Sequence, residues 1–195
     1  MLPRVVVVTD RRLVPNLPAA LAAALDAVPR DSLLVLLREK DLPGRELFAL
    51  AEAIAAVTAG RAKLVVSGRA DVALAVGADG VHAGGDAPPA AALKRRWPEL
   101  LVGASVHAPD EDAPGADYVL LAPIFAVPGK GAPLGLGALV AAARRGVPVF
   151  ALGGIDARNA AAARAAGAYG VAAMRSALEV SDPAAACAAL VRAAS

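Results

Sequence analysis

Short apolar runs recur along the whole chain, and most of them are followed by a segment with the periodicity of a helix. The runs are continuously apolar rather than alternating, which is typical of parallel strands covered on both faces. We expect strands at residues 5–9, 33–37, 64–67, 80–82, 101–105, 118–122, 149–152 and 170–173. We expect helices at residues 17–28, 44–59, 69–76, 88–97, 135–145, 157–166 and 183–194.

The alternation of eight strands with helical connections predicts an α/β protein, either a (β/α)8 barrel or a doubly wound sheet. The connection after residue 105 is thinner, since residues 110–113 offer at most one or two helical turns. The polar residues of interest follow strands distributed along the whole chain, whereas a doubly wound sheet concentrates its site at one switch point. We therefore expect a single (β/α)8 TIM barrel that forms one domain over residues 1–195.

Two features at expected strand ends point to an anionic ligand. Gly153 and Gly154 stand where a strand meets a helix, and in a parallel barrel that edge holds phosphate through backbone N–H groups. Leu36, Arg38 and Lys40 are spaced by two, so they project to the same side if their strand stays extended. Arg38 and Lys40 then form a clamp suited to phosphate or diphosphate, and the alternative is a solvated charged loop.

Composition and charge narrow the choice of partners. Only 3% of the residues are aromatic and the net charge is +2 with both signs interspersed, so stacking platforms and a basic stripe for nucleic acid are lacking. Cys187 is the only cysteine, which excludes a disulfide framework. The N-terminal apolar run is too short for a signal peptide, and no segment has the ~18 consecutive apolar residues of a membrane span. We expect a cytoplasmic protein with no nucleic-acid or membrane partner, and its alanine-rich outer helices leave a homodimer open.

The chain resembles the thiamine phosphate synthase family, which includes a thiazole tautomerase branch. The resemblance runs over residues 8–177 and rests on the segments LREKDL, GRADVALAVGADGVH, GASVH, ADYVLLAPIF, PGK, PLGL and ALGGI followed by Asn159. It implies a (β/α)8 barrel that joins thiazole phosphate to 4-amino-2-methyl-5-hydroxymethylpyrimidine diphosphate, giving thiamine phosphate and diphosphate. It also implies Mg²⁺ as a cofactor that gathers the charge of the leaving diphosphate.

The resemblance implies roles for residues at several strand ends. Arg38, Lys40 and Lys130 match the family's diphosphate-binding cations, and Lys130 stands in a long loop, 123–137, that is typical of a lid. The candidate catalytic residues are Arg38, Lys40, Lys130, Ser105 and His107. The candidate substrate- and phosphate-binding residues are Ser67, His82, Gly153, Gly154, Arg175 and Ser176. Asp86 is the candidate metal ligand.

The chain departs from the family pattern at positions that matter for the chemistry. Leu36 replaces a glutamine, and Gly68 replaces one of the family's metal carboxylates, while Asp86 stands one residue before the other. Val127 and Gly129 replace two threonines expected to contact the ligand. Mg²⁺ is therefore expected to be held weakly, through Asp86 and the diphosphate.

Three functions stay open at this point: a synthase, a thiazole tautomerase and a non-catalytic barrel that binds a phosphorylated ligand. Gly68 favours the tautomerase branch, but that branch uses a histidine where this chain has Pro123. His107 or His82 would then have to move the proton, although a lone loop histidine such as His107 is more often structural. Asp10 and Arg11, after the first strand, either cap the mouth or form an ion pair within the chain.

Overall fold

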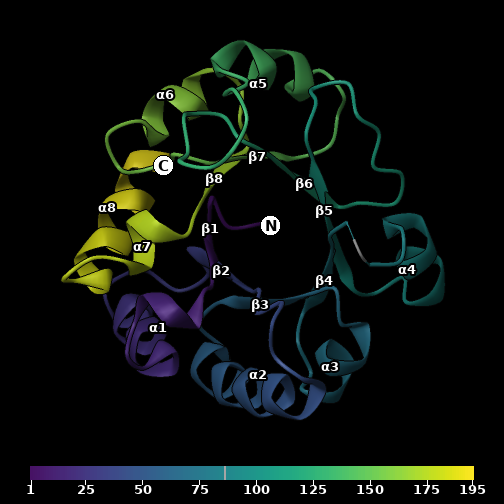
Figure 1. Ribbon diagram of the computed structural model, residues 1–195, viewed down its shortest axis with the longest axis vertical. Helices are drawn as coiled ribbons and strands as arrows, with labels where there is room; N and C mark the ends of the chain where they lie inside the picture. The colour runs from purple at the N-terminus through teal and green to yellow at the C-terminus, as the bar shows by residue number, and fades with distance from the viewer. Residues whose placement is uncertain (86) are drawn as a thin grey trace.

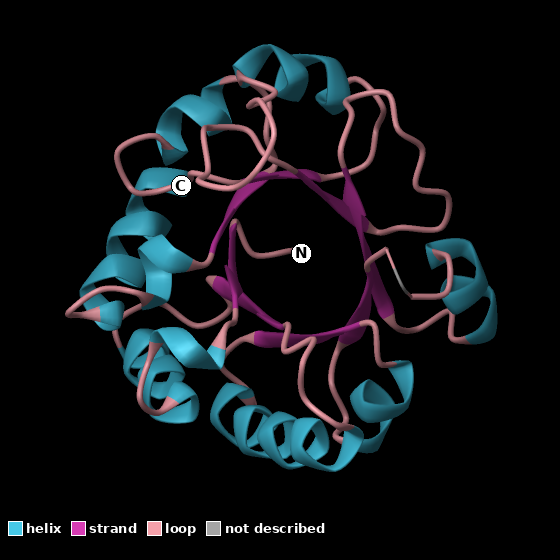
Figure 2. Cartoon of the chain, viewed as in Figure 1, coloured by secondary structure: helices cyan, strands magenta, loops and turns pink. Residues whose placement is uncertain are grey.

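The computed structural model describes residues 1–85 and 87–195. Eight parallel strands close into a barrel in the order in which they occur along the chain (Figures 1 and 2). β8 pairs back to β1, with Val171 opposite Val5, so the sheet has no free edge. The strands are β1 Val5–Val8, β2 Leu33–Leu37, β3 Lys63–Ser67, β4 Gly80–Ala83, β5 Leu101–Val106, β6 Tyr118–Leu121, β7 Val149–Leu152 and β8 Gly170–Ala173. The predicted TIM barrel is confirmed, and the doubly wound sheet is excluded.

Helices form a ring around the barrel (Figure 2). They are α1 Leu17–Asp26, α2 Gly44–Thr58, α3 Ala70–Ala75, α4 Ala90–Arg96, α5 Leu136–Ala143, α6 Ala160–Ala165 and α8 Pro183–Ala194. Two short helices were not predicted, the 3-10 helix η1 Arg11–Leu13 and α7 Arg175–Leu178. Residues 107–117, all within the described part of the chain, form turns and no helix, so the alternation is incomplete between β5 and β6. None of the helices in the described ranges is long and apolar enough to cross a membrane.

The barrel wall separates two apolar cores. Side chains alternate between the two faces of each strand, so Val5 and Val7 pack against the helices while Val6 and Val8 pack inside the barrel. This double burial is the reason that the strands are continuously apolar. The residues of the inner core are Val6, Val8, Leu34, Leu36, Val65, Tyr118, Leu120, Phe150 and Ala172.

The N-terminal segment covers one end of the barrel and lies near its axis in Figure 1. The Tyr169 hydroxyl donates to the carbonyl oxygen of Leu2 at 2.7 Å. The Arg4 guanidinium lies 4.0 Å from the centroid of the Tyr169 ring and donates to the Tyr169 carbonyl oxygen at 2.6 Å. Since this end is covered and the interior is filled by side chains, a ligand has to bind among the loops at the carboxyl ends of the strands.

Candidate active site

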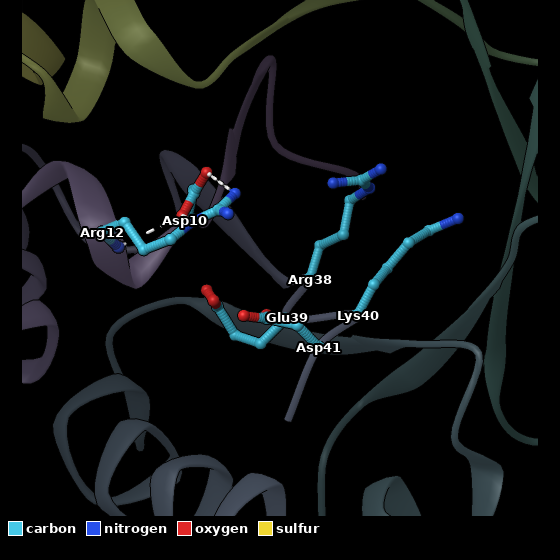
Figure 3. A pocket seen from close by; sticks show the side chains of 6 residues that line it. All are labelled: Asp10, Arg12, Arg38, Glu39, Lys40 and Asp41. Carbon is cyan, nitrogen blue, oxygen red and sulfur yellow. Dashed lines mark hydrogen bonds and ion pairs between the residues drawn. The ribbon is translucent and has the colours of Figure 1, made fainter. Parts of the chain in front are cut away.

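A hollow of about 270 Å³ opens where β1 and β2 end, and all six residues that line it are charged. Arg38 and Lys40 point the same way, while Glu39 and Asp41 point to the other side (Figure 3). This is the projection that their spacing predicts for an extended chain. Leu36, two residues before Arg38 and on the same face of the chain, is buried in the inner core. Two cations therefore stand side by side directly above the packed interior.

The backbone that carries these cations is anchored by Glu39, whose side chain is only 1% exposed. Its carboxylate accepts hydrogen bonds from the Thr9 hydroxyl at 2.7 Å, the Arg11 N–H at 3.0 Å and the Arg11 guanidinium at 3.1 Å. The Thr9 hydroxyl oxygen in turn accepts from the N–H of Arg38 at 3.0 Å. Glu39 was not among the residues predicted for the site. The signal was present, because a residue between two mouth-facing cations must turn its side chain the other way.

The remaining acidic side chains of the hollow are bound to arginines. Arg11 makes two hydrogen bonds to the Asp41 carboxylate, at 2.8 and 2.9 Å, and Arg12 makes two to Asp10, at 2.8 and 2.7 Å. Hydrogen bonds from Arg11 lower the pKa of Asp41 to about 2, and the hydrogen bond from Arg12 likewise lowers the pKa of Asp10. Asp10 and Arg11 do form ion pairs within the chain, but with these partners and not with each other.

The described residues do not fit a Mg²⁺ site held by the protein. Over residues 1–85 and 87–195, no group of three or more His, Cys, Asp or Glu side chains is arranged to hold a metal. Glu39 and Asp41, the chain neighbours of Lys40, are already hydrogen-bonded to Arg11. Ser67 ends β3 and offers a hydroxyl, and Gly68, which follows it, has no side chain to bind a metal. Asp86, the predicted metal ligand, lies outside the described residues.

Three of the predicted residues lie at or next to the carboxyl ends of the neighbouring strands β3, β4 and β5. Ser67 is the register partner of His82 across β3 and β4, and the His82 Nε2 lies 2.9 Å from the Ser105 Oγ of β5. His82 is only 2% exposed. Burial, and to a smaller extent the charge of Arg38, lowers the pKa of His82 to about 4. The imidazole is therefore neutral at physiological pH, and Arg38 is close enough to influence it.

His107 lies in a different setting, beyond the end of β5. Its side chain is exposed, and its backbone N–H donates to the Glu111 Oε2 at 2.6 Å. Its ring forms no hydrogen bond within the described part of the chain. The structure thus joins His82 to Ser105 and leaves the His107 ring in solvent.

The glycine pair is shaped by the preceding loop. Gly153 and Gly154 have φ values of +92° and +65°. A Cβ at Gly153 would lie 2.8 Å from the Cα of Pro123, and one at Gly154 would lie 2.7 Å from the Cβ of Phe125. The two loops are also tied by their backbones, since the N–H groups of Ile124 and Phe125 donate to the carbonyls of Leu152 and Gly153 at 2.9 and 3.0 Å. Only glycine satisfies both the conformation and the close approach.

The loop that begins with the glycine pair is held at both ends. The Asn159 side chain donates to the Gly154 carbonyl at 2.8 Å and accepts from the Asp156 N–H at 2.9 Å. The Ser176 hydroxyl donates to the Ile155 carbonyl at 2.6 Å, which ties the loop to α7. Its proton is therefore engaged within the protein. Arg175 is exposed and pairs with Glu179, at 3.5 Å.

Lys130 lies in the loop between β6 and α5. Its side chain is exposed, and its N–H donates to the Val127 carbonyl at 3.1 Å in a turn. The ends of the loop are joined by hydrogen bonds from the N–H groups of Leu134 and Gly135 to the carbonyls of Pro123 and Ile124, at 2.8 and 3.0 Å. The Ala122–Pro123 peptide bond is cis. The loop is thus fixed at its base and carries Lys130 away from it.

Comparisons with known proteins show the family of the chain. A family model described as thiamine monophosphate synthase matches residues 5–177. The thiamine-phosphate synthase of Roseiflexus sp. (strain RS-1) is 40% identical over 198 residues, which covers 95% of this chain and 83% of the relative. That of Anaeromyxobacter dehalogenans (strain 2CP-C) is 39% identical over 176 residues, covering 86% and 79%. The solved structure of thiamine phosphate pyrophosphorylase from Pyrococcus furiosus superimposes with a TM-score of 0.88 at 30% identity, covering 98% of this chain and 95% of that one.

Proposed function

The chain belongs to the thiamine monophosphate synthase family, and from this premise we propose that it is a transferase of thiamine biosynthesis. It joins 4-amino-2-methyl-5-hydroxymethylpyrimidine diphosphate to thiazole phosphate and releases diphosphate. The observation that carries the proposal is that Arg38 and Lys40 point the same way from a segment anchored by the buried Glu39 (Figure 3). The relatives named thiamine-phosphate synthase support the same reaction.

Charge development explains why the reaction needs this pair. The bond between the pyrimidine methylene carbon and the diphosphate oxygen breaks, and the oxygen keeps the electron pair. The thiazole nitrogen then donates its own pair to that carbon. Arg38 and Lys40 bind the leaving diphosphate as its negative charge grows, because cations fixed beforehand stabilise such charge without reorganising. Lys130, on its fixed-base loop, closes over the same diphosphate.

The thiazole phosphate binds on the other side of the mouth, at the loop that begins with Gly153 and Gly154. The positive φ values of Gly153 and Gly154 turn the chain where β7 gives way to the loop before α6, and the backbone N–H groups at such an edge suit an anion. Arg175 adds a cation at the adjacent α7. Ser176 serves the loop rather than the phosphate, since its hydroxyl donates to the Ile155 carbonyl.

No step of this proposal passes through Mg²⁺, because the described residues do not form a site for it. The predicted contribution of Asp86 is open to a direct test. Asp86→Asn should raise the Mg²⁺ concentration that gives half-maximal activity if this carboxylate takes part. An unchanged Mg²⁺ dependence would remove Asp86 from the proposal.

The reaction itself tests the proposed function. Purified protein with both substrates and Mg²⁺ should form thiamine phosphate, detected by chromatography. Arg38→Met should lower kcat/KM by about 100-fold or more, since it removes a charge-assisted contact to the leaving group. Arg144→Met, which removes an exposed arginine at the end of α5, should leave kcat/KM within about 2-fold.

Other outcomes would select the remaining functions. Absence of product at high enzyme concentration would reject the synthase. Conversion of a thiazole phosphate carboxylate between its tautomers would then favour an isomerase. Calorimetry that shows tight binding of thiazole phosphate without turnover would favour a non-catalytic barrel.

A further inference from the structure

Two polar atoms are buried inside the barrel without a hydrogen-bond partner among the described residues. They are the Nδ1 of His82 and the hydroxyl of Tyr118. His82 is 2% exposed and Tyr118 is 0% exposed, so neither atom has bulk water as a substitute. Buried polar atoms are nearly always hydrogen-bonded in folded proteins, because leaving them unpaired is costly. The pair therefore calls for an explanation.

The two side chains meet above a glycine. His82, Gly103 and Tyr118 are register partners on the adjacent strands β4, β5 and β6. A Cβ at Gly103 would lie 2.6 Å from the His82 Nδ1 and 2.5 Å from the Tyr118 hydroxyl oxygen. These two atoms are thus no more than about 5 Å apart, within reach of one bridging water or of a direct bond after a small ring rotation. The absent side chain at residue 103 is what brings them together.

We propose that Tyr118 is a positioning residue that acts on Ser105 through His82. The Tyr118 hydroxyl donates to the His82 Nδ1, directly or through one water, and this fixes the imidazole with its proton on Nε2. The Nε2–H then donates to the Ser105 Oγ, the contact seen at 2.9 Å. The hydroxyl proton of Ser105 is left to point into the mouth.

The number of donors and acceptors explains why the hydrogen bond runs from the Tyr118 hydroxyl to the His82 Nδ1. A phenol always carries a proton that needs an acceptor, and an unprotonated Nδ1 is an acceptor with no proton of its own. In the opposite tautomer, Nδ1–H would donate to the phenol oxygen, and the phenol proton would face no acceptor within the described part of the chain. A bridging water does not rescue this opposite tautomer. The water would accept from both the Nδ1–H and the phenol O–H, and its own two protons would then need acceptors. Burial also keeps the imidazole neutral, since it lowers the pKa of His82.

The arrangement gives Ser105 a definite chemical role. Its oxygen accepts from His82, so its proton is free to donate to an acceptor atom on a ligand, such as an anionic oxygen or an unprotonated ring nitrogen. Ser105 is therefore a fixed donor and not a general base. The kinetic consequence of this role rests on the proposed synthase function, whereas the tautomer of His82 does not.

The tautomer can be measured without any substrate. The chain has two histidines, so His107→Gln leaves the His82 ring as the only ¹⁵N-labelled imidazole. Between about pH 6 and pH 8, Nε2 should show the ¹⁵N shift of a protonated nitrogen and Nδ1 that of an unprotonated one. Adding Tyr118→Phe should convert this single tautomer into a mixture. A proton on Nδ1, an imidazolium at neutral pH, or a tautomer unaffected by Tyr118→Phe would overturn the proposal.

Kinetics provide the second test, with a matched control. Tyr118→Phe keeps the ring and its packing and should lower kcat by about 5-fold with little change in KM, the loss expected for one hydrogen bond. Tyr169→Phe removes a hydroxyl at the far end of the barrel, where it donates to Leu2, and should leave kcat within about 2-fold.

The two failures are distinguishable. A chain that makes no thiamine phosphate but holds the Nε2–H tautomer through Tyr118 refutes the proposed function and supports the inference. An active synthase with the proton on Nδ1 refutes the inference alone. An active synthase whose kcat is unchanged by Tyr118→Phe also counts against the positioning role.

Discussion

The two sides of the barrel mouth are stabilised in different ways. Beyond β1 and β2, side chains hold the chain in place, since the buried Glu39 binds Thr9 and Arg11 and so aligns the segment that carries Arg38. Beyond β6 and β7, the loops are held by backbone hydrogen bonds and by the space that Gly153 leaves. The stability of the first side should therefore depend on charge and on pH. The stability of the second side should fall when a side chain is added at its glycines, and it should hardly depend on pH.

The largest effect is expected on the glycine side, from Gly153→Ala. The new Cβ would lie 2.8 Å from the Cα of Pro123 at a φ of +92°, so the backbone itself has to move. Strain and overpacking together should lower the free energy of unfolding by about 3–5 kcal/mol. Gly129→Ala is the matched control, because its φ is +74° and its Cβ would meet no described atom within 4 Å. It should cost only about 1–2 kcal/mol in urea unfolding. Equal losses in the two variants would mean that the close approach to Pro123 does not matter.

The next effect concerns His82, which lies between the two sides. Its pKa is lowered to about 4 in the folded protein by burial, and to a smaller extent by Arg38, from an ordinary 6.5. A lowered folded pKa means that stability is fully present above about pH 6.5 and is lost as the pH falls toward about 4. The shift corresponds to about 3 kcal/mol of unfolding free energy. Denaturant unfolding from pH 7 to pH 4 should show this loss in the parent and in His107→Gln, and a smaller loss in His82→Gln. Identical slopes in the two variants would contradict it.

On the charged side, Glu39→Gln should lower the unfolding free energy by about 2 kcal/mol. The amide keeps the shape but cannot accept from the Thr9 hydroxyl and from Arg11 as a carboxylate does. It should also lower kcat/KM of the proposed synthase by about 10-fold, since Arg38 is no longer aligned. Asp41→Asn alters the exposed partner of the same Arg11 and should change the unfolding free energy much less than Glu39→Gln does. A stability loss with unchanged kcat/KM in Glu39→Gln would show that the cations do not depend on this anchor.

The same contrast explains what could be predicted from the sequence. All eight strands were predicted, with ends within one residue, because burial on both faces makes a parallel strand continuously apolar. The common side to which Arg38 and Lys40 point was predicted from their spacing in an extended chain. Residues 110–113, which were expected to give at most one or two helical turns, form no helix, and α7 was missed because it is too short for helical periodicity to be detected.

The contacts that hold the site were harder to predict than its elements. Glu39 was missed because its partners, Thr9 and Arg11, are about thirty positions away in the chain, and only the closing of β1 against β2 brings them together. The role of Gly103 was missed for the same reason. A glycine shows in the sequence, but the two rings that need its missing side chain come from different strands. The roles of Lys130, His107 and Arg175 stay predictions.

The smallest effect is expected from Asp41. Its ion pair should make the stability of the charged side depend on pH in a range where the glycine side does not respond. Hydrogen bonds from Arg11 lower the pKa of Asp41 to about 2 from an ordinary 3.8. A carboxyl group with a lowered pKa contributes stability above its unfolded pKa and loses it as the pH falls through the folded value. Asp41→Asn should therefore flatten the pH dependence of unfolding between about pH 4 and pH 2, whereas Gly129→Ala on the other side should leave that slope unchanged. The side chain of Asp41 is exposed, so solvent and salt screen the pair, and added salt should shrink the difference between the parent and Asp41→Asn. A difference that persists in high salt would mean that Asp41 acts through the buried Glu39 and not through its own ion pair.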